Sequence, residues 1–179
     1  MMNRRMLPML TFLLAVSLPA LVQAHKQSDQ ETFKEAQATE ESSGGNAAAE
    51  FVLGDSFEHG RGTPQDYAQS LSWYMKSANR AYPAAQVPLA WLYFTHGPLD
   101  NADKNMGEAY FWVDVAVASE LPVKQGGLSK DSRERALLLK KMIEGGALNG
   151  GTPIPALLSP DQIAAAQARA TEWFAQHKE

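Results

Sequence analysis

The chain has 179 residues, of which 45% are hydrophobic, and a formal net charge of −4. This length and composition fit one modest domain with enough apolar residues for a packed core. The absence of cysteine excludes disulfide bonds and a lipid anchor attached through cysteine. Because no long basic stretch occurs, the sequence predicts no nucleic-acid partner.

Residues 1–24 have the pattern of a secretory signal peptide. Arg4 and Arg5 give a positive start, an apolar run over 6–21 follows, and Val22-Gln23-Ala24 supplies small residues before a cleavage site. A membrane anchor is the alternative, but the run is shorter than the roughly 20 residues that span a bilayer. We therefore expect the signal to be removed and the remaining chain to be periplasmic or secreted, without stable membrane insertion.

Residues 25–46 are rich in acids and amides and end in Ser-Ser-Gly-Gly. A segment with so few apolar residues buries too little surface to offset the entropy lost on ordering. The sequence predicts a flexible leader here. The alternative is a short helix over 31–41, favoured by helix-forming residues.

Two copies of one pattern follow, over 47–83 and 84–120. Leu53 and Phe57 of the first copy correspond to Leu89 and Tyr93, which lie 36 positions further along. Trp73 and Trp112 also correspond, at a spacing of 39 residues, so the second copy has a longer loop. A repeat of this length predicts helical hairpins that bury their apolar faces by stacking on one another.

The expected helices of the two hairpins cover 47–59, 63–79, 84–95 and 105–119. Gly54 has no side chain and predicts a close approach of a neighbouring helix, while Gly60 predicts a left-handed cap at a helix end. Thr63 followed by Asp66 resembles a capping box that starts the second helix. Pro88 implies that the third helix either begins late or is kinked, because proline donates no backbone hydrogen bond.

The remaining segment, 121–179, is predicted to hold two capping helices. One begins at a capping box around Asp131 and ends at Gly145. The other begins at Ser159-Pro160, with Gln162 three residues after the serine. Terminal helices of this kind cover the exposed end of a repeat stack.

The stretch from Ala49 to Tyr67, which contains Leu53-Gly54 and Gly-Thr-Pro-Gln-Asp-Tyr, resembles a Sel-one-like repeat, a relative of the tetratricopeptide repeat. The second copy is similar at Leu89, Tyr93 and Trp112. The resemblance implies an all-α superhelix of antiparallel helix pairs. It also implies that a protein partner binds on the concave side, as in adaptors and periplasmic regulators of this family.

The first helix of each hairpin is expected to line the concave side. Its positions between the core residues are predicted to point outwards and bind the partner, and they are Val52, Asp55, Ser56, His59, Trp91, Leu92 and Thr95. Trp91 is the expected anchor, although burial is an equal alternative for a tryptophan. Trp73 is predicted to be a core residue between the second and third repeat helices.

Catalytic and metal-binding patterns are missing from the sequence. No serine has lysine three positions later, and His59 and His96, each at a helix end, fit capping or exposure better than metal binding. We expect no cofactor and no metal. The leading interpretation is an exported, non-catalytic protein-binding module; a secreted hydrolase, a cell-wall-binding protein (penicillin or peptidoglycan) and a structural envelope subunit are the alternatives.

Overall fold

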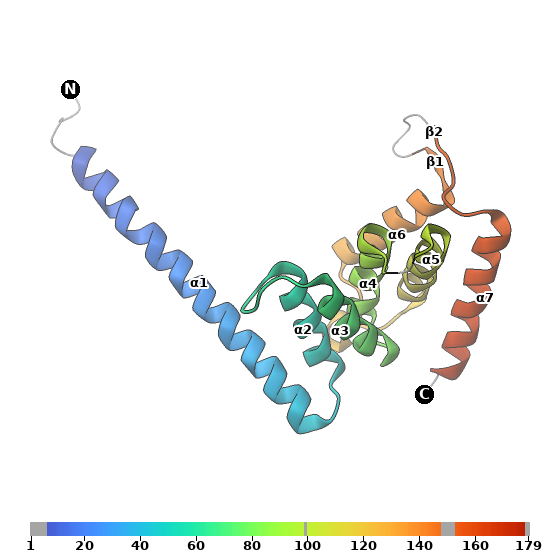
Figure 1. Cartoon of the computed structure of the whole chain (residues 1–179), viewed down its shortest axis with the longest axis horizontal. Helices are drawn as coiled ribbons and strands as arrows, with labels where there is room; N and C mark the ends of the chain where they lie inside the picture. Colours follow the sequence, from blue (N-terminus) through green and yellow to red (C-terminus); the bar gives the residue numbers. More distant parts are fainter. Residues whose placement is uncertain (1–6, 99, 148–152, 178–179) are drawn as a thin grey trace.

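The structure is a computed structural model in which residues 7–98, 100–147 and 153–177 are described. They form seven α-helices, one 3-10 helix and one pair of short strands (Figure 1). The helices are α1 (Leu7–Ser43), α2 (Ala47–His59), α3 (Tyr67–Asn79), α4 (Pro83–His96), α5 (Ala102–Ala118), η1 (Val123–Gln125), α6 (Lys130–Glu144) and α7 (Pro160–Gln176). Strands β1 (Gly146–Ala147) and β2 (Pro153–Ile154) pair antiparallel between α6 and α7.

The helices stack in chain order. The pairs α2–α3 and α4–α5 are the two repeats, and α3 joins them by packing on α4. Helix α6 packs on both α5 and α4, whereas α7 packs along α5 (Figure 1). The predicted all-α stack of helix pairs with C-terminal capping helices is confirmed, and the short β1–β2 pair is an addition that the sequence did not predict.

The main core extends from α3 to α7. Tyr74, Leu89 and Tyr110 are among its largest side chains, and each is at most 1% exposed. Trp112 is also part of this core and is 3% exposed, as its position in the repeat predicted. Leu53 belongs to a separate, smaller cluster between α1 and α2.

Residues 25–43 form the second half of α1, so the prediction of a flexible leader is wrong. The ring of Phe33 packs edge to face on Phe57 of α2, with centroids 5.5 Å apart. Ala36, one helical turn further on, is 6% exposed and contacts the small cluster that contains Leu53. Phe33 and Ala36 lie on the same face of α1 and contact α2 and its cluster, a placement that the overall composition of the segment concealed.

Trp73 does not lie between α3 and α4, so this prediction is wrong. It is half-buried beside the cluster shared by α1 and α2, and the Nζ of Lys76 lies 3.6 Å from its ring centroid. Its neighbour Tyr74 takes the buried position instead. Successive helical residues are rotated by about 100°, so a correspondence of one position in the repeat does not guarantee the same burial.

The predicted start of α3 and the predicted late start or kink at Pro88 in α4 need correction, and α5 begins at Ala102, three residues before the predicted position 105. Helix α3 begins at Tyr67 and not at Thr63, because the Asp66 carboxylate accepts the backbone N–H of Ala68 at 2.9 Å and caps the helix there. Aspartate is a stronger N-cap than threonine. Helix α4 runs without interruption through Pro88, and its burial against neighbouring helices offsets the hydrogen bond that proline does not donate.

The later helices differ less from the prediction. Helix α6 is capped by Ser129, whose Oγ accepts the N–H of Ser132 at 3.1 Å, and it therefore starts before Asp131. The capping box at the start of α7 is confirmed. Ser159 Oγ accepts the Gln162 N–H at 3.2 Å, and the Ser159 N–H donates to Gln162 Oε1 at 2.8 Å.

Gly54 sets the spacing between α2 and α3. A Cβ placed there would lie 2.5 Å from Cδ1 of Tyr74, which is closer than real side chains approach. The hydroxyl of Ser70 also donates to the Gly54 carbonyl at 2.8 Å, a contact that needs the two helices to be near each other. The close approach predicted at this glycine is confirmed.

Gly54→Ala should therefore destabilise the protein by about 1–3 kcal/mol, because the added methyl group overpacks the α2–α3 contact. Gly107→Ala in α5 is the matched control, since a Cβ there has no neighbour within 4 Å. It should raise stability by roughly 0.5–1 kcal/mol, because alanine favours a helix more than glycine does. Urea unfolding measures both, and equal effects would contradict the close contact.

Ala36→Glu should undock α1 from α2, because it buries a carboxylate without a partner at a cost of at least about 1 kcal/mol. Amide hydrogen exchange over residues 30–43 should become faster in this variant. Ala38→Glu places the same charge at an exposed position of the same helix and should leave exchange unchanged. Identical exchange in both variants would mean that α1 does not depend on Ala36.

Candidate partner-binding surface

Helix α4 is the central helix of the stack and is buried over most of its circumference. Its buried positions contact α3, α5 and α6, which pack around it. The stripe that stays partly exposed passes through Pro88, Trp91 and Thr95, spaced three and four residues apart. Such spacing places these side chains on one face of the helix.

Trp91 is half-buried on this stripe. Its ring packs edge to face on Phe94, with centroids 5.7 Å apart, and the guanidinium carbon of Arg135 lies 6.0 Å from its ring centroid. Its indole N–H is buried and has no hydrogen-bond acceptor among the described residues. Tryptophan and arginine are both enriched in protein interfaces, so this pair is a candidate anchor.

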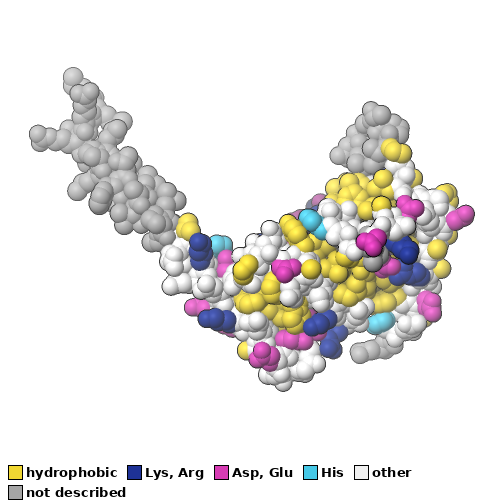
Figure 2. All heavy atoms as spheres, in the orientation of Figure 1, with side chains coloured by type: hydrophobic (Ala, Val, Ile, Leu, Met, Phe, Trp, Pro, Cys, Tyr) yellow, Lys and Arg dark blue, Asp and Glu magenta, His cyan; other side chains and the backbone are white. Residues whose placement is uncertain are grey.

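Helix α6 supplies the other side of the surface. Arg135 is exposed, and Leu138, three positions further along, is 44% exposed. Figure 2 shows hydrophobic side chains gathered over the part of the molecule where α4, α5 and α6 lie. The name α4–α6 surface is used below for Pro88, Trp91, Thr95, Arg135 and Leu138.

The predicted residues of the first repeat lie elsewhere. Ser56 is 3% exposed, so its predicted exposure is wrong, and Val52 is half-buried in the cluster beside α1. Asp55 is half-buried and accepts a hydrogen bond from Arg61 at 2.7 Å, while the exposed His59 places Nδ1 3.2 Å from its carboxylate. Because α1 packs on α2, this part of the expected concave side is largely occupied.

Leu92 is also not a surface residue. It is 2% exposed, because α4 is enclosed by three helices and the positions on both sides of Trp91 face neighbours. The predicted set is therefore divided. Trp91 and Thr95 lie on the α4–α6 surface, whereas Val52 packs beside the cluster with α1 and Asp55 pairs with His59 and Arg61.

Two buried tyrosines form hydrogen bonds with glutamates of neighbouring helices. Tyr110 donates to Glu144 at 2.5 Å, and Tyr74 donates to Glu58 at 2.7 Å. Burial raises the pKa of both hydroxyls above the ordinary value for tyrosine, and the neighbouring carboxylates raise it further. Both phenols act as hydrogen-bond donors that join helices, Tyr74 from α3 to α2 and Tyr110 from α5 to α6.

His59, His96 and His177 contact aromatic rings or lie at helix ends, whereas His25 lies 3.6 Å from the Asp29 carboxylate within α1. His96 stacks on Tyr67 with centroids 3.9 Å apart, and His59 Nδ1 lies 3.1 Å from the Asp55 carbonyl oxygen at the end of α2. Over the described ranges, no group of three or more histidine, aspartate or glutamate side chains is placed to hold a metal ion. Among the helices in those ranges, none is both long and apolar enough for a membrane span.

Arg135 and Leu138 were not predicted from the sequence. A signal for them exists in the run Leu137-Leu138-Leu139 of α6, because three consecutive helical residues cannot share one buried face. In the structure only Leu139 is buried, and Leu137 and Leu138 are 47% and 44% exposed. The run therefore leaves Leu137 and Leu138 as an exposed apolar pair on a charged helix.

Comparison with known proteins identifies a solved structure with a similar fold. No protein-family model matches the chain, and no curated protein matches it. Among solved structures the chain is similar to the crystal structure of c5321, a protective antigen present in uropathogenic Escherichia coli strains that displays an SLR fold. The TM-score is 0.55 and the sequence identity 22%, over 86% of this chain.

The chain spans about a quarter of that protein, 26% of its length. At this level of identity the similarity concerns the fold and not the activity. The chain thus has the fold of Sel-one-like repeats, which the resemblance of its first hairpin predicted.

Proposed function

We propose that the protein is an exported, non-catalytic repeat module that binds a protein partner in the bacterial envelope. The observation that carries the proposal is the helical-repeat fold with a half-buried tryptophan, Trp91, beside exposed Arg135 and Leu138. Stacked helix pairs of this kind present a rigid surface for other chains. Within it, the α4–α6 surface is the proposed docking area.

The composition of this surface supports a protein partner. Trp91 and Leu138 give an apolar centre, and Thr95 and Arg135 give a polar edge. Interfaces commonly combine an apolar core with a polar rim, and a few aromatic or arginine anchors contribute most of the affinity.

The export proposal predicts that the mature protein starts at His25. N-terminal sequencing of the protein from its native host should give His25 as the first residue, because Val22 and Ala24 place small side chains before the cleaved bond. The positive start at Arg4 and Arg5 lies outside the described residues. A soluble protein that retains residues 1–24 would contradict export by this route.

The docking proposal predicts that Trp91→Ala weakens partner binding by at least about 1 kcal/mol, the loss typical of an anchor residue. The partner is first captured with the full chain from envelope extract, and its affinity for the variants is then measured by calorimetry. Because Trp91 also packs on the core, Trp91→Ala is compared with wild type at matched helicity by circular dichroism.

Arg135→Glu tests the same surface without touching the core, since this side chain is exposed. It should weaken binding as well, because it reverses the charge beside the anchor. Lys130→Glu makes the same charge change near the start of α6, more than one turn away, and should bind as wild type does. Unchanged affinity in both Trp91→Ala and Arg135→Glu would rule out the α4–α6 surface as the docking area.

A further inference from the structure

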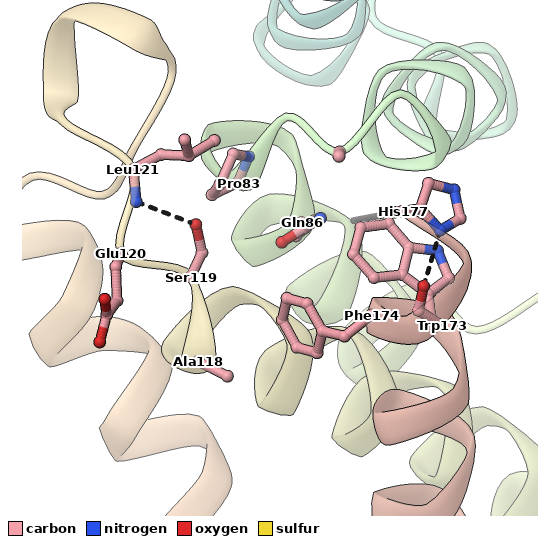
Figure 3. Close-up of a pocket in the computed structure, with 10 residues that line it drawn as sticks. Pro83, Gln86, Ala118, Ser119, Glu120, Leu121, Trp173, Phe174 and His177 are labelled. Atoms are coloured by element: carbon pink, nitrogen blue, oxygen red, sulfur yellow. Dashed lines mark hydrogen bonds between the residues drawn. The ribbon is translucent and has the colours of Figure 1, made fainter. Parts of the chain in front are cut away.

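A second feature lies away from the α4–α6 surface, between the start of α4, the end of α5 and the end of α7. A cavity of about 420 Å³ opens there (Figure 3), and an adjoining cavity of about 850 Å³ shares Ala81, Leu121 and His177 with it. The name α4–α7 groove is used for the two together. Its apolar lining includes Pro83, Leu121, Trp173 and Phe174.

Two sets of hydrogen bonds fix the position of the chain segments that line this groove. The guanidinium of Arg133 donates to the carbonyls of Val117 and Ser119 at 2.8 and 3.0 Å and fixes the end of α5. The N–H of Ala84 donates to the Gly126 carbonyl at 2.9 Å and fixes the following loop against the start of α4. The groove is therefore a built feature of the fold and not a gap beside a loose loop.

Gln86 is the unusual residue of the lining. It is 1% exposed, yet its side-chain oxygen has no hydrogen-bond donor among the described residues. Its side-chain nitrogen makes only one long contact, 3.5 Å to the carbonyl of Ala78. Figure 3 shows the carboxamide between Ser119 and Trp173, within the ring of side chains that line the cavity. A buried acceptor left in this state lowers the stability of the fold.

Trp173 places a second unpaired group in the same lining. Its indole N–H is buried without an acceptor in the described part of the chain, and its ring stacks on His177 with centroids 4.0 Å apart. One unpaired acceptor and one unpaired donor thus belong to side chains that line a single apolar cavity, and both atoms are covered in this structure. A ligand that satisfies both must offer a hydrogen-bond donor and an acceptor together with an apolar surface.

We propose that the α4–α7 groove is a second binding site, which takes an extended peptide segment with an apolar or aromatic side chain. A backbone N–H of the peptide donates to Gln86 Oε1, and a backbone carbonyl accepts from the Trp173 indole. The apolar side chain lies against Phe174 and Leu121. A small rotation of the Gln86 carboxamide aims its oxygen into the cavity, because the last torsion of a glutamine side chain is soft.

The lining of the groove also restricts which side chains the bound peptide can carry. Glu120 is in the lining, but its carboxylate points away from Gln86 and Trp173 (Figure 3). Arg80, which lines the adjoining cavity, is paired with Glu50 at 3.1 Å. The apolar lining made by Pro83, Leu121 and Phe174 disfavours a charged side chain at the anchor position, because the lining offers a buried charge no partner. The site therefore favours a peptide with a neutral anchor side chain over an acidic one, and it differs in position and ligand from the α4–α6 surface.

The test titrates the full, ¹⁵N-labelled chain with acetylated and amidated glycine pentapeptides that carry a central Phe, Leu or Glu. The Phe and Leu peptides should shift the resonances of the Gln86 side-chain amide and the Trp173 indole N–H, and the Glu peptide should bind more weakly. Gln86→Met keeps the length of the side chain and should lower the affinity for the Phe peptide roughly three- to tenfold, the loss of one hydrogen bond. The fold should remain as stable as wild type or become more stable, because an unpaired buried group is removed.

Gln69→Met is the matched control, at an exposed position near the start of α3. It should leave the affinity for the Phe peptide unchanged. A water molecule bound to Gln86 is the competing explanation, and it predicts that Gln86→Met lowers stability while no peptide shifts the two resonances. That result, or equal affinity of Gln86→Met and wild type for the Phe peptide, would overturn the proposal. Neither result depends on whether a partner binds the α4–α6 surface.

Discussion

The burial of α4 by three neighbouring helices is the constraint on which the rest of the structure depends. Leu89 and Ala90 are fully buried at its centre, and the helix passes through Pro88 without losing its continuity. A helix in this position cannot contribute a broad surface. One narrow outward stripe of α4 and the start of the helix remain. The stripe is the part of α4 in the α4–α6 surface, and the start of α4 is its part in the α4–α7 groove.

The placement of α7 determines the character of both sites. It packs along α5, with Trp173 edge to face on Trp112 at 6.2 Å, and the Arg169 guanidinium pairs with Glu108 at 2.8 Å. Since α7 is directed to α5, the face of α6 that carries Leu137 and Leu138 stays open. The same placement brings the end of α7 towards the start of α4. Trp173, Phe174 and His177 therefore line one side of the groove.

Much of the fold could be predicted from the sequence because its signals are local. The cap at Ser159, the glycine contact at Gly54 and the left-handed cap at Gly60 each depend on a few neighbouring residues, and all three are confirmed. The docking of α1 and the positions of Ser56 and Leu92 depend on helices distant in sequence. A period of 36 residues predicts that hairpins stack, but it does not specify which additional helix covers which face.

The two proposed sites differ in how they could have been recognised. Trp91 stands out in the sequence as a tryptophan between core positions, so its surface was partly predictable. Gln86 does not stand out, because a polar residue near the start of a helix is ordinarily exposed. Only its complete burial, combined with a side-chain oxygen that finds no donor, reveals it as unusual.

A buried polar group without a partner lowers stability, and natural cores contain few of them. Packing alone gives no reason for glutamine at position 86, since methionine would fill the same space without an unsatisfied oxygen. The nitrogen contact to Ala78 is too long to justify the amide, and that carbonyl already accepts the N–H of Ala81 at 3.0 Å. A ligand that donates a hydrogen bond inside the groove accounts for both the choice of side chain and its burial.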